Sequence, residues 1–440
     1  MLDVIFVLYY ITFLFVIVWF AALSGFSLFR FSIPSFVIVA FLIFSYIGIL
    51  PMYFQWDMNR VLLGVVNKQL IFFILIISSY SIFIVVLTML ILSKISMSSS
   101  IDSISKVVLC GPLNLREHIL IAILVVVCVF ILSKYYFSLE SIALISAFEG
   151  NSDIARIRSD MTNNYSGKYH WVSLIINNVL PFISFVLFAS FIKKPSFFLC
   201  FYFIVLFLLT SFGLLSASLK SPFAWFLIGL FLVYVYIKSE MKYPVKITIF
   251  LFSVVFALLI SNYLMFSNIT ELPKALKAIF SRLFTGQIAN VYFYLDFYPE
   301  TREYLLGRSF PNPKSIWPFT PVSISVEIMD LVSPKLKAIG VVGSAPTVYW
   351  GEVYVNFGFV GLLVSPVFIG ILVYLIWYLS FMLPSSPVSV AFAVWAALHY
   401  KNLAATGISG FLIDFYAVVM IAIVFLWVLV SGKIKFRRLV

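Results

Sequence analysis

The sequence has little charge for its length. Only 10% of its 440 residues are Asp, Glu, Lys or Arg, whereas 63% are hydrophobic. Soluble domains contain about 25% charged and about 45–50% apolar residues, so these proportions exclude a water-soluble globular fold. They exclude a Rossmann, kinase or TIM-barrel enzyme for the same reason. The sequence instead predicts a polytopic integral membrane protein.

Residues that bind metals or form disulfides are also scarce, with three cysteines and three histidines in the chain. The histidines are isolated, and no HxxH, HExxH or CxxC spacing occurs, so we expect no bound metal and no cofactor. The cysteines form no disulfide framework. The net charge of +12 indicates membrane orientation and contact with anionic headgroups or phosphate-bearing ligands, rather than nucleic acid.

Long apolar windows bounded by charges or proline predict an all-α bundle of about 11 transmembrane spans in one domain, 1–440. The period-2 alternation of a barrel strand is absent. No basic region precedes the first window, which we therefore expect to be a retained span and not a cleaved signal. The windows are 4–22, 33–50, 69–93, 118–137, 171–191, 196–212, 222–238, 246–266, 350–380, 387–404 and 410–431.

The basic carboxyl-terminal tail predicts a cytoplasmic C-terminus by the positive-inside rule. Counting spans back from the tail places two larger loops outside, 138–170 and 267–349. The exception to the rule is the loop 51–68, because Arg60 and Lys68 fall on the outer side.

The first outer loop contains an R-x10-G spacing from Arg156 to Gly167, with Arg158 two residues further on. The planar guanidinium group of arginine matches two phosphate oxygens, so these side chains are candidate phosphate ligands. The alternative is that they pair with nearby acidic side chains or anchor at lipid headgroups.

The second outer loop interleaves basic and aromatic residues with prolines. Its candidate ligands are Arg282, Arg302, Arg308, Lys314 and Trp317. The prolines hold an extended path at a lower entropic cost than a flexible segment. The alternative is a rigid, solvated lid with snorkelling basic side chains. The stretch 273–295 predicts a helix that lies in the membrane interface.

Ionisable residues at the membrane edge are candidate functional groups because their desolvation costs several kcal/mol when they are unpaired. Glu352, Asn356 and Tyr349 share one helix face. We expect Glu352 to bind or deprotonate a hydroxyl, or alternatively to pair with a loop arginine. His399 is a second candidate base, or else a packing residue.

Three stretches resemble the Wzy-type O-antigen polymerases, which join oligosaccharide repeat units at bacterial inner membranes. They are the R-x10-G segment, LGRSF at 306–310 followed by WP at 317–318, and EVYVNFGFVG at 352–361. Some families of this kind have a second, R-x15-G motif that this chain lacks, which leaves both Arg282 and Arg308 as candidates for a second essential arginine.

The resemblance implies a metal-independent glycosyltransferase of GT-C type that acts on undecaprenyl-pyrophosphate-linked donor and acceptor glycans at the periplasmic face. It implies catalytic roles for Arg156, Arg282, Arg308, Glu352 and His399. Its expected partners are membrane lipids, a chain-length regulator and a flippase. Three alternatives stay open: an O-antigen ligase, a flippase or other transporter, and an envelope scaffold. The side chains expected to bind substrate are Arg158, Gly167, Arg302, Lys314, Trp317, Tyr349, Tyr354 and Asn356.

Overall fold

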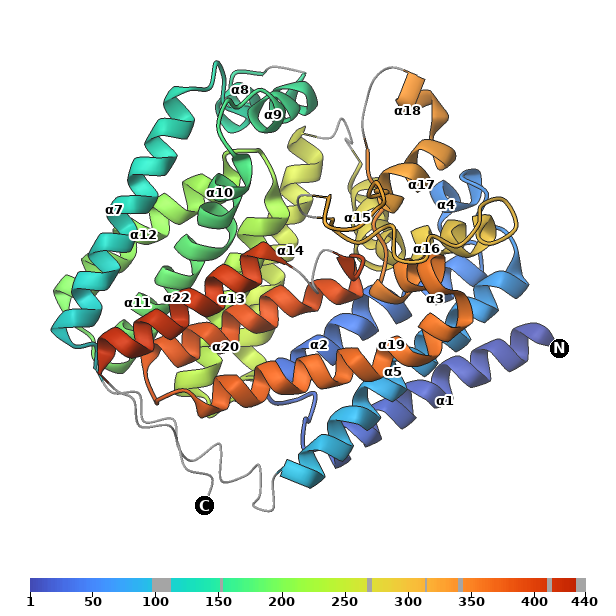
Figure 1. The fold of residues 1–440 in the computed structure, drawn as a ribbon, viewed down its shortest axis with the longest axis horizontal. Coiled ribbons are helices and arrows are strands. Elements are labelled where there is room, and N and C mark those ends of the chain that lie inside the picture. The colour runs from blue at the N-terminus through green and yellow to red at the C-terminus, as the bar shows by residue number, and fades with distance from the viewer. Residues whose placement is uncertain are drawn as a thin grey trace. The chain divides into compact units, whose positions relative to one another are not determined.

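The computed structural model describes residues 1–96, 112–150, 153–266, 271–312, 315–338, 343–409 and 414–432. The described ranges contain helices joined by turns and loops, and no strands, which confirms the predicted all-α membrane class (Figure 1). Eight helices among them are long and apolar enough to cross a membrane. The helices at the other three predicted windows are α14 (Val245–Phe266), α20 (Pro387–Tyr400) and α22 (Phe415–Ser431). Their described apolar parts are shorter, so the number of eleven spans stays a prediction.

The chain divides into two compact units. Unit 1 comprises Met1–Ser98, Phe256–Trp377 and His399–Asp414, and unit 2 comprises Ser99–Val255, Tyr378–Leu398 and Phe415–Val440. Unit 1 contains α1 (Leu2–Leu23), α2 (Ile33–Phe41), the π-helical turn η1 (Leu42–Tyr46), α3 (Ile49–Tyr53), α4 (Met58–Leu62), α5 (Lys68–Ser96), α15 (Leu272–Phe280), the π-helical turn η3 (Ser281–Thr285), α16 (Gly286–Phe297), α17 (Ile324–Val332), α18 (Pro334–Ala338), most of α19 (Tyr349–Met382) and the 3₁₀ turn η5 (Lys401–Ala404).

Unit 2 is built around α11 (Leu180–Lys193), most of whose side chains are buried. The helix α12 (Phe197–Leu215) and the helix α13 (Lys220–Lys238) both pack against it. The Asn178 side chain, two residues before the start of α11, accepts a hydrogen bond from the Trp395 indole at 3.0 Å. The unit also contains α22, most of α20, the first part of α14, α7 (Leu115–Phe137), α8 (Ala143–Phe148), α9 (Ile154–Asn163), α10 (Tyr169–Leu174) and the π-helical turn η2 (Ile175–Val179).

Several helices of the bundle begin at side chains that satisfy free backbone N–H groups. At α2, Ser32 and Ser35 form a capping box, and Asn114 and Glu117 form another at α7. Each box satisfies two donors that lack a partner in the first helical turn. These short polar signals explain why the helices start where the apolar windows predict.

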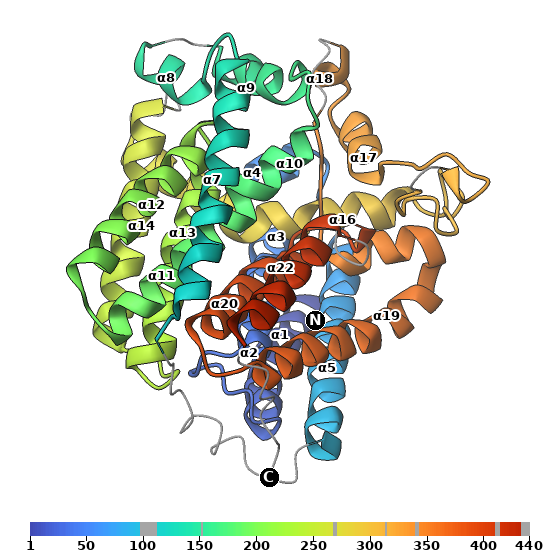
Figure 2. The same ribbon diagram turned by 60° about the vertical axis from the view of Figure 1, so that its left-hand side comes forward.

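In unit 1, α5 lies beside both α1 and α19 in the two views (Figures 1 and 2). At one end of these helices, Asp3 accepts hydrogen bonds from Tyr53 and Lys68. The loop 54–67 and the segment 271–298 meet at this same end, because the Tyr292 hydroxyl accepts a hydrogen bond from the Asn67 N–H at 3.3 Å. The loop 54–67 and the segment 271–298 therefore lie together, as the predicted order of spans requires for two loops on the same side of the membrane. Which side that is stays a prediction.

The stretch predicted to lie in the interface, 273–295, is helical but is not a surface helix over its whole length. Residues of α15 at its ends, such as Leu272 and Phe280, are exposed. In α16, by contrast, Ile288, Ala289 and every residue from 291 to 295 are buried. The prediction of an interfacial helix is thus wrong for α16, since burial on all sides makes it part of the core of unit 1.

Candidate functional site

The helix α19 is interrupted at Gly358, whose φ of 58° and ψ of −145° lie outside the helical region. Glycine adopts this conformation without the strain that a side chain would impose. Next to the break, the carbonyl oxygens of Val355 and Asn356 accept hydrogen bonds at 3.0 Å from the N–H groups of Leu305 and Leu306. In a continuous helix these carbonyls would serve the helical ladder alone. The break in α19 thus accompanies the docking of a turn, Leu305–Ser309, which we call the docked turn.

Two side chains of α19 fasten the docked turn. The Asn356 amide accepts from the Gly307 N–H at 2.9 Å and donates to Ser309 Oγ at 2.8 Å. The Glu352 carboxylate accepts from the Ser309 hydroxyl at 2.6 Å. Both side chains are buried, with exposed fractions of 2% for Glu352 and 0% for Asn356. The predicted shared face of Glu352 and Asn356 is therefore present, and it holds the turn that carries Arg308.

The second carboxylate oxygen of Glu352 contacts a third segment, the chain after η5. It accepts from the Ser409 N–H at 3.0 Å, and a Cβ placed on Gly407 would lie 2.0 Å from it. A side chain at position 407 would therefore displace the Glu352 carboxylate. Within the described ranges Glu352 forms no ion pair with an arginine, so its charge is satisfied by a hydroxyl and an N–H group instead of the salt bridge considered from the sequence.

Arg308 lies on the docked turn with its side chain exposed. Its Nε donates to the Leu305 carbonyl at 3.1 Å, which orients the guanidinium group. Nearby, Arg302 forms an ion pair with Glu327 at 3.1 Å. Burial, and to a lesser degree Glu327, raise the pKa of the Tyr298 phenol to about 12, against the opposing effect of Arg302 and Arg308. Arg302, Arg308, Glu327 and Tyr298 thus form one cluster at the end of α16.

His399 and Asp414 form a buried pair in unit 1, with His399 Nε2 3.0 Å from Asp414 Oδ2. At this distance the Asp414 carboxylate orients the imidazole ring of His399. The sequence marks His399 as a candidate base but gives no reason to pair it with Asp414. The same stretch of chain, after His399, supplies the Ser409 N–H that binds Glu352.

Arg282 does not join the Arg302–Arg308 cluster. It lies in η3, at the beginning of α16, whereas Arg302 follows the end of that helix. The helix has 12 residues and is therefore about 18 Å long at 1.5 Å per residue. The structure thus separates arginines that the sequence assigned to one loop and one task.

Arg156, Arg158 and Gly167 belong to unit 2. Arg156 is exposed on α9 with its Nε 4.0 Å from Asp160, and an exposed pair of this kind contributes little to stability. Arg158 Nε donates to the Ala217 carbonyl at 2.9 Å, and burial lowers the pKa of this guanidinium group. Arg158 therefore joins α9 to the turn after α12, while Arg156 stays a candidate phosphate ligand.

The two tyrosines expected to bind sugars are buried in unit 1. The Tyr349 and Ser81 hydroxyls share a hydrogen bond of 2.6 Å, and the Tyr354 hydroxyl donates to the Tyr298 carbonyl at 3.1 Å. Both hydroxyls therefore have partners within the fold, and sugar binding by them stays a prediction.

Trp317 is 57% exposed and suits the stacking role predicted for it. The Asn312 side chain braces its loop, because it accepts from the Trp317 N–H at 2.9 Å and donates to the Trp317 carbonyl at 2.8 Å. Such bracing lowers the entropic cost of presenting an aromatic ring to a ligand. Lys314, also predicted here, lies outside the described residues.

Comparison of the chain with known protein families, with curated proteins and with solved structures finds no match. Within the described ranges, no group of three or more His, Cys, Asp or Glu side chains could hold a metal ion.

Sequence reasoning missed Ser309, Ser409 and Gly407, which complete the contacts of Glu352. Their residue types are common in loops, and only the folded chain brings them together. It also gave no role to Arg60 or Asp57, although Arg60 was marked as an exception to the positive-inside rule.

Proposed function

We propose that the protein is a glycosyltransferase of the bacterial inner membrane that polymerises undecaprenyl-pyrophosphate-linked repeat units into O-antigen or a related polysaccharide. The proposal includes a GT-C architecture of eleven spans, a cytoplasmic C-terminus and a reaction at the periplasmic face. The observation that supports it most is the exposed Arg308, held on a turn that buried Glu352 and Asn356 fasten to α19. A fixed guanidinium group at one end of an apolar bundle suits a phosphate carried by a lipid.

In the proposed reaction a sugar hydroxyl of one lipid-linked chain attacks the anomeric carbon of the other. A bond forms between that oxygen and the anomeric carbon, the bond from the carbon to the pyrophosphate oxygen breaks, and the lipid pyrophosphate leaves with the electron pair. Arg308 and its neighbour Arg302 stabilise the charge that develops on the pyrophosphate. Fixed groups of this kind contribute about 10²–10³-fold to kcat when a single one is tested by removal.

The proton of the attacking hydroxyl goes to a general base, and we assign this role to His399. The ion pair with Asp414 orients the ring and stabilises the imidazolium ion that forms. Glu352 is the less suitable base, because both of its oxygens already accept hydrogen bonds from Ser309 and Ser409. We therefore assign Glu352 and Asn356 to positioning of the docked turn.

The test is the gel banding of surface lipopolysaccharide from cells that lack the gene and are complemented with wild type, Arg308→Ala or Lys274→Ala. Lys274 is an exposed cation of the same loop, paired with Glu271, and serves as the matched control. We expect the long ladder with wild type and Lys274→Ala, and core plus one repeat unit with Arg308→Ala. Complete loss of capped core would point to a ligase or flippase, and an unchanged ladder with Arg308→Ala would contradict the enzyme proposal.

A further inference from the structure

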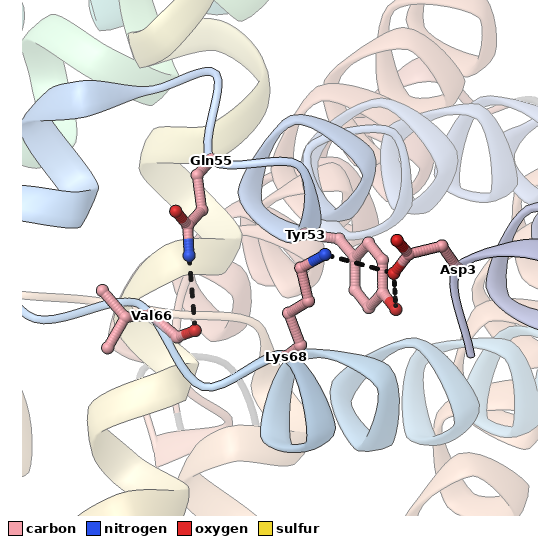
Figure 3. Close-up of polar contacts among 5 residues, drawn as sticks. All are labelled: Asp3, Tyr53, Gln55, Val66 and Lys68. Carbon is pink, nitrogen blue, oxygen red and sulfur yellow. Dashed lines mark hydrogen bonds and ion pairs between the residues drawn. The ribbon is translucent and has the colours of Figure 1, made fainter. Parts of the chain in front are cut away.

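The loop 54–67 is anchored at both ends (Figure 3). Asp3 Oδ1 accepts from the Tyr53 hydroxyl at 2.8 Å and from Lys68 Nζ at 3.1 Å, so one carboxylate holds the residues that flank the loop. Between them, the Gln55 side chain donates to the Val66 carbonyl at 3.5 Å and spans the neck of the loop. The loop is thus a fixed feature of unit 1, and its side chains have defined neighbours.

Asp57 connects this loop to η3. Its Oδ2 accepts from the Ser281 and Thr285 hydroxyls at 2.5 Å each, and Asp57 is only 6% exposed. On the other side of η3 the backbone approaches Gly48 so closely that a Cβ there would lie 2.0 Å from the Phe284 carbonyl oxygen. π-helical turns such as η3 are rare and often occur at functional sites.

Arg60 lies beside this junction, where a Cβ on Gly286 would be 3.3 Å from one of its terminal nitrogens. Its Nε is buried without a hydrogen-bond partner among the described residues, and so is Oδ1 of Asp57. Burial lowers the pKa of Arg60; Asp57 opposes this effect, and the nearby Arg282 adds to it. Arg282 lies in η3 next to Ser281, whose hydroxyl binds Asp57, so both arginines border the same junction.

We infer that Arg60 and Arg282 form a second phosphate-binding site, separate from the one at Arg302 and Arg308. A bound phosphate would supply an acceptor for the unpartnered Nε of Arg60 and a negative charge beside both guanidinium groups. The two sites lie at opposite ends of α16, about 18 Å apart by the length of that helix.

The assignment of a ligand rests on the proposed function. A chain whose sugar hydroxyl attacks at Arg308 carries its own lipid pyrophosphate at the far end of its oligosaccharide. The second pyrophosphate must therefore bind away from the reacting centre, at a distance that the oligosaccharide spans. The Arg60–Arg282 site fulfils this requirement, because it shares one end of unit 1 with the Arg302–Arg308 cluster and is separated from it by α16.

The first experiment measures binding to the purified full-length protein in detergent micelles by calorimetric titration with inorganic pyrophosphate and, separately, with farnesyl pyrophosphate. The variants are Arg60→Gln, Arg60→Lys and the control Lys274→Gln, which removes the same charge from an exposed position. We expect two sites in wild type and in the control. Arg60→Gln should weaken one site at least tenfold, because a charge-assisted hydrogen bond contributes about this much, and Arg60→Lys should weaken it less.

Unchanged binding of both probes to Arg60→Gln would overturn the inference. A parallel titration with vesicles that contain phosphatidylglycerol tests for a lipid-headgroup anchor, and an effect of Arg60→Gln confined to the vesicles would also overturn the inference. Thermal melting of each variant shows whether it is folded, and the Arg60→Lys arm keeps the test valid should Arg60→Gln be unstable.

The second experiment measures polymerisation by the full-length enzyme at varied concentrations of lipid-linked acceptor. Arg60→Gln should raise the acceptor KM at least tenfold with little change in kcat, whereas Arg308→Ala should lower kcat. A kcat loss in Arg60→Gln without a KM change would contradict the assignment to the acceptor. If wild type showed no transfer at all, the proposed function would fail, while the pyrophosphate titration would still decide whether the Arg60 site exists.

Discussion

The contacts of Glu352 allow a prediction that separates a positioning role from catalysis. Glu352→Ala removes a buried carboxylate that is the acceptor for the Ser309 hydroxyl and for the Ser409 N–H. Hydrogen bonds to charged groups are worth about 1.5–3 kcal/mol each, so the loss is about 3–6 kcal/mol. Relief of the desolvation of the carboxylate offsets part of this cost.

Glu352→Gln keeps the shape of the side chain and one of its two acceptor oxygens. Its amide oxygen can face the Ser409 N–H, and its amide nitrogen can donate to Ser309 Oγ, because a hydroxyl oxygen also accepts. We therefore expect a destabilisation of at most about 3 kcal/mol, the value of one charge-assisted hydrogen bond. The docked turn and Arg308 should stay in place.

The assay combines thermal melting of the purified protein with a polymerisation rate for each variant. We expect Glu352→Ala to melt well below wild type and to be inactive, and Glu352→Gln to keep activity to within about tenfold. A general base contributes about 10²–10⁴-fold. A loss of that size in a stably folded Glu352→Gln variant would refute the positioning role and identify Glu352 as the base. Wild-type melting of Glu352→Ala would show that these contacts do not hold the turn.

Two further predictions concern the same cluster. Gly358→Ala places a side chain at a φ of 58° and 3.0 Å from the Tyr304 ring. The substitution should destabilise the protein by about 1–3 kcal/mol through backbone strain alone and should lower its activity. Thermal melting and the polymerisation rate measure the two effects, and unchanged values for both would contradict the docking role of the break. The pKa of Tyr298 is raised from 10 to about 12, chiefly by burial, so the phenol loses its proton at a lower pH in the unfolded chain than in the folded one. The contribution of the protonated phenol to stability is therefore complete below pH 10 and is lost as pH rises from 10 towards 12. Wild type should therefore lose more stability than Tyr298→Phe over that window in alkaline unfolding, and equal losses would show that the phenol is not buried as described.

The sequence predicts the helices well because membrane burial leaves a strong signal. An apolar window such as 69–93 has to form a helix, since backbone groups in lipid must be satisfied within the segment. The structure places α5 there, at Lys68–Ser96. For the stretch 273–295 the sequence predicts the helix but not its burial. Its basic residues between apolar ones are typical of a helix in the membrane interface. The burial of α16 depends on helices that contact it from distant parts of the chain, α3, α5 and α17, and no local pattern contains that information.

The candidate site was predictable as a set of residues but not as an arrangement. Glu352 and Asn356 were singled out by their spacing, and their shared face follows from helix geometry. Their partner Ser309 is 43 positions from Glu352, and nothing in its residue type marks it. The separation of Arg282 from Arg308 was hidden for a different reason. A long loop has no predictable path, whereas the helix α16 inside it fixes the separation of the two arginines.

Lys68 and Arg60, the two predicted exceptions to the positive-inside rule, differ in their charge partners. Lys68 has a counter-ion, because its Nζ lies 3.1 Å from Oδ1 of Asp3. Arg60 lies near Asp57, yet the two form no ion pair within the described residues, and the Asp57 Oδ2 is bound to Ser281 and Thr285. On the predicted topology, a cation on the outer side opposes the orientation bias of insertion, and the buried Nε of Arg60 also loses hydration. Of the two, Arg60 is therefore the residue whose retention calls for a ligand that arrives after folding, and a phosphate on a lipid carrier has the charge to be that ligand.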